Sequence, residues 1–398
     1  MNRLLAALLA LLLVSCGKPP PQADIPLDLP PDSTHLPVLP DSLVLPYVTA
    51  ADSVWPGLEE GLYLNTGVTA DSARLHAALR SARAAGLNIV CFDVKTMRGD
   101  ITIRLPERDD LLPHPDRGLH NLSRLTRTLH DYDMRSVARL VMFHDSWLAA
   151  RRPDLRPYSS PGVPWCENER KAPAWLDPSH PEVQRDLLAL IDVVARSGVD
   201  EIQLDYVRFP TQGAIDDAWF AFEWEDELVE GSDGHLCVPR KPDVIAAFVR
   251  QAREVCDRYG VELSADVFAI VLWGREVDIE KTGQDLRQMT PWLHRVHPML
   301  YSSHFAPDFS HRNDVPNEPY QIVFDSVSRC REMTDDNCLV MPYLQAMTWG
   351  VDFSSQYVLA QVQAARHAGA DGYLMWHSSS WYSKLLPWLQ EYKESGAL

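Results

Sequence analysis

Apolar runs of strand length alternate with stretches of helical periodicity along most of the chain. Each run is apolar nearly throughout, which is typical of strands that are covered on both faces. The eight runs are residues 61–67, 88–95, 135–143, 201–209, 262–270, 295–302, 338–346 and 372–379. A parallel sheet buried between helices is therefore expected.

Helical patterns occupy several of the intervals between these runs, and each of the clearest ones ends at a glycine. Glycine often follows the last turn of a helix because it adopts a positive φ without strain. The expected helices are 69–85, 183–194, 242–259 and 355–367, followed by Gly86, Gly198, Gly260 and Gly369. Eightfold strand–helix alternation favours an α/β fold, a single-domain (β/α)8 TIM barrel with long βα loops, over a doubly wound sheet.

The first 46 residues have a different pattern. Arg3 is followed by an apolar run over 4–14, which is too short to span a bilayer and has the length of a signal-peptide core. It ends in Leu-Val-Ser-Cys at 13–16, which resembles the lipobox of bacterial lipoproteins. We therefore expect a signal peptide over 1–15, lipidated Cys16 and a proline-rich tether to residue 46. Gly17 favours the outer membrane, facing the periplasm, and the domain proper would cover 47–398.

The composition limits the classes of molecule that this protein is expected to bind. The formal net charge is −18 and no run of Lys or Arg occurs, so nucleic acid is a poor partner and membrane contact should run through the lipid alone. Six cysteines remain without Cys16, and an oxidising compartment would permit disulfides. Cys330–Cys338 is the preferred pair, and Cys166–Cys237 is a weaker one. No CxxC or His-rich cluster is present, and neither a metal nor a cofactor is expected.

Polar side chains gather where the expected strands end. In (β/α)8 barrels, the reactive groups lie at the carboxyl ends of the strands. Six of the eight strands carry such residues: Asp93, Lys95, Asp205, Tyr206, Arg208, Asp266, Tyr301, His304, Gln345, Trp376 and His377. This distribution predicts one site at the barrel top.

The same segments resemble a known family. NIVCFDVK, VARLVMFHDSWLAARRPDL, WLDPSHPEV, DEIQLDYVRFP, SADVFA, HPMLYSSHF, PYLQ and GYLMW occur in the order found in the "Putative glycosyl hydrolase domain" family, a bacterial domain of unknown function with an α-amylase-like barrel. The resemblance covers about 61–382. It implies a glycoside hydrolase acting on a cell-envelope or extracellular polysaccharide. Thr96-Met97-Arg98 and the long loop 216–241 depart from the family pattern and are expected to affect substrate choice.

Glycosidic cleavage usually needs two carboxyl groups, one a proton donor and the other a nucleophile or base. By the resemblance to α-amylase-like barrels, Asp205 on the fourth strand is the nucleophile or base, and Asp266 on the fifth is the acid. Arg208 would keep Asp205 ionised, and Asp266 should have a raised pKa. The structural alternatives are an Asp205–Arg208 salt bridge, and a loop cap or substrate hydrogen bond at Asp266.

Each of the remaining candidate site residues allows more than one role. Asp93 and Lys95 could pair with each other or contact sugar hydroxyls, and Arg139, in mid-strand, should pair with Asp93 or Asp205. Substrate binding is the interpretation for Tyr206, Tyr301, His304, Gln345, Trp376 and His377, although each histidine alone is more often a loop residue. Tryptophans in post-strand loops could pack on sugar faces: Trp147, Trp165, Trp219, Trp224, Trp349, Trp376 and Trp381.

Two other classes of function remain open. One is a catalytically inactive glycan-binding or envelope-scaffold lipoprotein that uses the same cleft. The other is a metal-dependent polysaccharide deacetylase. The sequence has no GxSxG elbow and no GxGxxG after the first strand, which weakens serine-hydrolase and dinucleotide-binding interpretations.

Overall fold

The computed structural model describes residues 58–104, 121–159, 162–168, 172–224, 229–230, 236–312 and 314–398. The expected signal peptide, Cys16 and the proline-rich tether lie outside these residues. Within the described ranges, no helix is long and apolar enough to cross a membrane.

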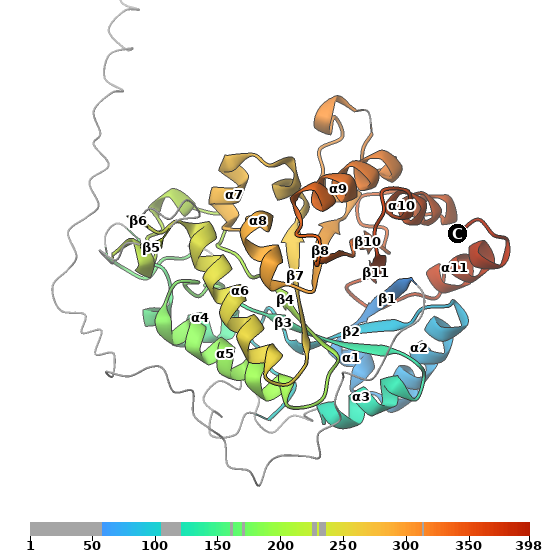
Figure 1. Cartoon of the computed structure of the whole chain (residues 1–398), viewed down its shortest axis with the longest axis horizontal. Coiled ribbons are helices and arrows are strands. Elements are labelled where there is room, and N and C mark those ends of the chain that lie inside the picture. Colours follow the sequence, from blue (N-terminus) through green and yellow to red (C-terminus); the bar gives the residue numbers. More distant parts are fainter. Residues whose placement is uncertain are drawn as a thin grey trace, which may run out of the picture.

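The central sheet closes into a parallel barrel of eight strand positions (Figure 1). In order around the barrel these are β1 (Glu59–Leu64), β2 (Ile89–Lys95), β3 (Arg135–Val141), β4 (Glu201–Asp205), β7 (Glu262–Phe268), β8 (Arg295–Leu300), the interrupted pair β9 (Leu339–Val340) and β10 (Tyr343–Gln345), and β11 (Gly372–Trp376). β11 pairs with β1 and closes the ring. The predicted fold class and all eight predicted strands are confirmed.

Helices surround the strands on the outside (Figure 1). They are α1 (Thr66–Thr69), α2 (Ser72–Ala84), α3 (Leu122–His130), α4 (Ser146–Arg151), α5 (Pro181–Ala195), α6 (Lys241–Asp257), α7 (Glu276–Thr282), α8 (Leu286–Met289), α9 (Pro319–Met333), α10 (Ser355–His367) and α11 (Leu385–Glu394). Asp71 caps α2 by accepting a hydrogen bond from the Arg74 N–H at 3.0 Å. A small hairpin of β5 (Val229–Glu230) and β6 (Leu236–Cys237) lies between β4 and α6 in the sequence. The four helices expected from the apolar stripes are confirmed.

The barrel interior is layered because inward positions recur every second residue along a strand. At the amino ends of the strands, charged side chains from five strands form an ion-paired layer in which the three central members are buried and Glu59 and Glu262 are partly exposed: Glu59, Arg135, Glu201, Glu262 and Arg295. The next layer is mixed: it includes the apolar cluster of Ile89, Cys91, Val137, Met341, Tyr343 and Leu374, together with the buried Gln203, which hydrogen-bonds to Tyr343 and Cys91. The third layer, at the carboxyl ends, carries the candidate site.

The preferred disulfide is not formed. Cys330 and Cys338 are both buried free thiols. The Cys330 sulfur lies 3.7 Å from the Thr334 hydroxyl, whereas the Cys338 sulfur points to the Leu339 carbonyl at 3.9 Å. The loop between them therefore directs the two side chains to different partners. The side chain of Cys237, which the weaker pairing needs, lies outside the described residues.

Candidate active site

Arg139, at an inward position of β3, organises the top of the barrel. Its Nε donates to Oδ2 of Asp205 at 3.0 Å, and its Nη2 pairs with the same oxygen. Its Nη1 donates to Oδ1 of Asp93 at 2.5 Å. Burial alone would lower the pKa of Arg139, but Asp205 and Asp93 raise it well above its usual value. The expected pairing of Arg139 with Asp93 or Asp205 is confirmed, with both acids.

Asp205 is held rigidly at the end of β4. Its second oxygen, Oδ1, accepts a hydrogen bond from the backbone N–H of Tyr206 at 2.6 Å. Tyr206 has a φ of 51°, a left-handed conformation that a tyrosine rarely adopts. Such strain is found where the surrounding structure fixes a functional geometry. The carboxylate of Asp205 is thus fixed on one oxygen by Arg139 and on the other by a strained turn.

Asp266, at an inward position of β7, has a different environment. Only 2% of its surface is exposed, and its Oδ1 has no hydrogen-bonding partner among the described residues. Burial and the neighbouring negative charge of Asp205 raise the pKa of Asp266 well above its usual value, against the opposing effect of Arg139. A carboxyl group in this setting remains protonated at pH values where an ordinary aspartate is ionised.

Arg208 does not hold Asp205, contrary to the expectation from their spacing. Its Nη1 donates to the Phe209 carbonyl at 3.0 Å, and its guanidinium packs on aromatic rings instead of a carboxylate. The reason is geometric. The chain bends at Tyr206, directly after Asp205, whereas Arg139 on the neighbouring strand pairs with Asp205.

Asp93 and Lys95 do not pair with each other either. The register between β2 and β3 shifts between these two residues, so their side chains reach different partners. Asp93 accepts from Arg139 and from the Tyr63 hydroxyl, the latter at 2.5 Å. Lys95 forms a buried ion pair with Asp145 at 2.9 Å. Asp145 also caps α4, which makes the Lys95 pair a support for the loop after β3.

Tyr301 and Trp376 lie beside the acids. Burial raises the pKa of the Tyr301 hydroxyl, and the charges of Asp266 and Asp205 raise it further, which places this hydroxyl within electrostatic reach of both carboxyl groups. The Trp376 ring packs on Tyr63 with centroids 4.3 Å apart, and the Arg139 guanidinium lies 5.7 Å from its centroid. The aromatic rings therefore form part of the wall around the Arg139 cluster.

Gln345 is the last residue of β10, whereas His304 and His377 lie beyond the ends of β8 and β11. Gln345 is fully buried, donates to the carbonyls of Met347 and Trp349 at 3.0 Å each, and accepts from Ser303. Its polar groups join two loops, which is a positioning role and not the expected substrate contact.

The two histidines are less enclosed. His304 packs edge-on against Trp349 with centroids 4.6 Å apart. His377 accepts a hydrogen bond from the Ser379 N–H at 3.1 Å, and burial lowers the pKa of both imidazoles. Neither contacts Asp205 or Asp266 through a hydrogen bond or ion pair among the described residues.

The tryptophans divide into two groups. Trp165 is buried and donates to the Ala214 carbonyl at 2.9 Å, so it is a core residue. Trp349 and Trp381 are exposed to 57% and 70%. Trp219 and Trp224 lie near each other in the loop after β4, with centroids 6.2 Å apart, and Trp147 packs on Arg151. The exposed rings remain candidates for contacts with sugar faces.

The sequence pattern does not predict that Tyr63, Trp175 and Phe268 belong to the site. Tyr63 supports Asp93, and the other two pack on Arg208. The period-two spacing from Gly61 would have placed Tyr63 inside the barrel. Trp175 stands in the WLDPSHPEV segment, but no spacing rule connects that segment to Arg208.

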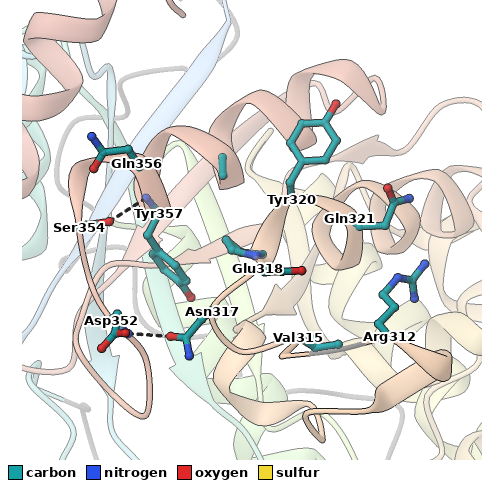
Figure 2. Close-up of a pocket in the computed structure, with 12 residues that line it drawn as sticks. Arg312, Val315, Asn317, Glu318, Tyr320, Gln321, Asp352, Ser354, Gln356 and Tyr357 are labelled. Atoms are coloured by element: carbon teal, nitrogen blue, oxygen red, sulfur yellow. Dashed lines mark hydrogen bonds between the residues drawn. The ribbon is translucent and has the colours of Figure 1, made fainter.

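A groove of about 750 Å³ lies on the outer surface, between the beginnings of α9 and α10 (Figure 2). Its polar groups bond to each other: the Asp352 N–H donates to Asn317 at 2.8 Å, and Ser354 accepts from the Tyr357 N–H at 3.2 Å. None of the candidate residues at the barrel top lines it. We therefore place the functional site at the acids and not at this groove. In the described part of the chain, no three His, Cys, Asp or Glu side chains are grouped to hold a metal ion.

The closed barrel with a pair of buried acids at its carboxyl end defines the class of (β/α)8 proteins to which many glycosidases belong. The chain matches the family described as "Putative glycosyl hydrolase domain" over residues 61–382, and it belongs to that family. No protein with a curated description matches the chain.

Solved structures share the fold at low sequence identity. The PgaB (BpsB) glycoside hydrolase domain of Bordetella bronchiseptica has a TM-score of 0.57 and 16% identity, covering 84% of this chain and 98% of that one. The catalytic domain of β-amylase from Paenibacillus polymyxa has a TM-score of 0.54 and 9% identity, covering 86% and 100%. A β-galactosidase from Bacillus circulans has a TM-score of 0.53 and 10% identity, covering 81% and 50%. These similarities show the (β/α)8 fold.

Proposed function

We propose that this protein hydrolyses glycosidic bonds of a polysaccharide with Asp205 and Asp266. The observation that carries the proposal is the contrast between two neighbouring acids. Asp205 is paired with Arg139, whereas Asp266 has an oxygen with no partner in the described structure and a raised pKa. Pairs of carboxyl groups whose environments separate their protonation states are how glycosidases obtain an acid and a base at one pH.

The roles follow from this contrast. Asp266 would give its proton to the leaving glycosidic oxygen, and Asp205 would act as the nucleophile or as the base that activates water. Over the full reaction, water adds across the C–O bond and both carboxyl groups return to their starting states. Tyr301, Trp376 and Tyr206 would contact the sugar next to these groups.

The near-complete burial of both acids favours one other function. Asp205 is 5% exposed and Asp266 is 2% exposed, which leaves little of either for a substrate to reach. A protein that binds glycans at the barrel mouth without turnover would have the same arrangement. This second candidate predicts binding with no release of reducing ends.

The test is an assay of reducing-end release from a panel of envelope and extracellular polysaccharides. We expect wild-type protein to release reducing ends in the presence of a strong chelator, and Asp205→Asn to lose nearly all of this activity while keeping its fold and its binding of the substrate. A metal-dependent deacetylase would release acetate and no reducing ends, so acetate release that is lost on chelation, without any release of reducing ends, would favour that alternative. Near-normal turnover by a folded Asp205→Asn variant would contradict the proposed role of Asp205.

A further inference from the structure

Arg208 is a buried cation that has no acidic partner among the described residues. Only 7% of its surface is exposed, yet none of the described residues forms an ion pair with it. Its one described hydrogen bond, from Nη1 to the Phe209 carbonyl at 3.0 Å, uses a single N–H of the five that a guanidinium carries. Buried arginines are rarely left in this condition, because removing a charge from water is unfavourable unless an opposite charge compensates it.

Three aromatic side chains surround the guanidinium. Its central carbon lies 4.2 Å from the ring centroid of Phe268, 4.6 Å from that of Trp175 and 5.0 Å from that of Tyr206. Stacking of this kind fixes the orientation of the planar group and partly offsets its burial. The aromatic rings hold Arg208 in place but do not neutralise it.

The charge persists at neutral pH. Burial lowers the pKa of Arg208 to about 10, against the opposing effects of Tyr206, Asp205 and Glu167. The two acids therefore lie within electrostatic reach without forming an ion pair with the guanidinium. The site combines a fixed, desolvated cation with donors that are not used inside the described protein.

Arg208 also stands beside the proposed catalytic acids. It follows Asp205 by three residues, and Phe268, on which it packs, follows Asp266 by two. Gln284 donates to the carbonyls of Asp266 at 3.0 Å and of Val207 at 3.4 Å, which ties the ends of β7 and β4 together. A group bound by Arg208 would thus lie next to the sugar at Asp205 and Asp266.

We propose that Arg208 anchors a subsite for a sugar carboxylate, so that the polysaccharide substrate is acidic. This inference rests on the proposed function of the barrel top. A guanidinium matches a carboxylate through two parallel hydrogen bonds, which makes it selective for a uronic acid over the neutral sugar of the same shape. The ligand would supply the negative charge that the described chain does not place against Arg208.

The experiment measures binding by isothermal titration calorimetry, in the Asp205→Asn background, so that turnover does not interfere. The probes are oligosaccharides of galacturonic acid, of mannuronic and guluronic acid, and of glucuronic acid with N-acetylglucosamine. Each is compared with its carboxyl-reduced counterpart, which has the same linkages and no charge. We expect at least one acidic probe to bind about tenfold or more tightly than its reduced form, the range of a charge-assisted hydrogen-bonded pair.

Variants assign the preference to Arg208. Arg208→Gln should abolish the difference between acidic and reduced probes, and Arg208→Lys, which keeps the charge without the planar fork, should retain part of it. Arg80→Gln, which removes an exposed arginine on α2, should leave the preference unchanged. Thermal unfolding of each variant shows whether the fold is kept, and a folded Arg208→Lys protein answers the question if Arg208→Gln does not fold.

Two results would overturn the inference. One is that no acidic probe binds more tightly than its reduced counterpart, and the other is that the preference survives in folded Arg208→Gln. Hydrolysis of a neutral polysaccharide with Arg208→Gln unimpaired would contradict the acidic substrate while supporting the hydrolase. Arg208-dependent binding of an acidic probe that is never cleaved would support the subsite and contradict the hydrolase.

Discussion

At the scale of single residues, the sequence predicts that Arg139 pairs with Asp93 or Asp205, but it does not show that one arginine holds both acids or that Arg208 packs on aromatic rings instead. Asp205 and Asp266 are predicted site residues because an acid near the end of an apolar strand has few explanations. Their partners come from other strands. Arg139 reaches Asp205 only because β3 and β4 are neighbours in a closed barrel. Proximity in the chain predicts that Arg208 pairs with Asp205, but its guanidinium packs on Trp175 and Phe268 instead.

The shared ion pair makes Arg139 the most consequential support at this scale. Arg139→Met would leave Asp93 and Asp205 buried without a counter-charge, and we expect the free energy of unfolding to fall by about 3–5 kcal/mol. Arg139→Lys keeps a charge but loses the three-nitrogen contact, so its stability loss should be smaller and its activity still severely reduced. Urea unfolding and the reducing-end assay measure both effects.

The matched control is Arg83→Met, which removes an exposed arginine that pairs with Asp133 at 3.3 Å. Exposed pairs contribute about 0–1 kcal/mol, so this variant should be nearly as stable as the wild type. Equal losses in Arg83→Met and Arg139→Met would show that Arg139 carries no special role.

At the scale of elements, the hydrophobic pattern predicted all eight barrel strands and the clearest helices. It did not predict the irregularities. The register shift at β2 sends Asp93 and Lys95 to different partners, and the seventh strand position is split into β9 and β10 around Met341 and Pro342. Proline lacks the N–H that a continuous ladder needs, which accounts for the split. Such local breaks depend on neighbouring strands that a single run of sequence does not show.

The seam between β1 and β11, which closes the barrel, depends on Gly372. A Cβ at this position would lie 1.8 Å from the Glu59 carbonyl oxygen, which belongs to the backbone of β1 and cannot move aside. We expect Gly372→Ala to lower the free energy of unfolding by about 1–3 kcal/mol, as overpacking does. Gly67→Ala is the control, because its Cβ would meet only the Asn65 side chain at 3.3 Å. Urea unfolding that gives the same midpoint for both variants would contradict this account of the seam.

At the scale of the whole molecule, the two ends of the barrel interior have different tasks. The layer at the amino ends satisfies its own charges: Arg295 pairs with Glu59 at 2.7 Å and Arg135 pairs with Glu201 at 2.9 Å. The layer at the carboxyl ends leaves Asp266 and Arg208 incompletely satisfied within the described residues. Ion pairs at the bottom of such barrels serve stability, and unsatisfied groups at the top mark the site.

The segment before the barrel concerns the location of the protein in the cell. We propose that Cys16 is lipidated and that a proline-rich tether holds the domain at the outer membrane, facing the periplasm. Cys16→Ser should abolish labelling by a radioactive fatty acid and release the protein from membranes. Unchanged membrane fractionation of Cys16→Ser would contradict the anchor.

Limited proteolysis should trim the wild type to a stable core beginning near residue 47. A stable cut within the core would contradict a single domain.

The division of roles between the two acids is tested most directly by the dependence of Asp266→Asn on the leaving group. A proton donor matters most when the departing oxygen is a poor leaving group. We predict that Asp266→Asn loses about 10²–10⁴-fold in kcat/KM on a polysaccharide, and far less on an activated aryl glycoside of the same sugar. The protonated acid is lost as pH rises through the raised pKa of Asp266, so we expect the rate of the wild type to fall on the alkaline side and the variant to lack this fall. Equal losses on both substrates, with the alkaline limb unchanged, would contradict the assignment of Asp266 as the acid.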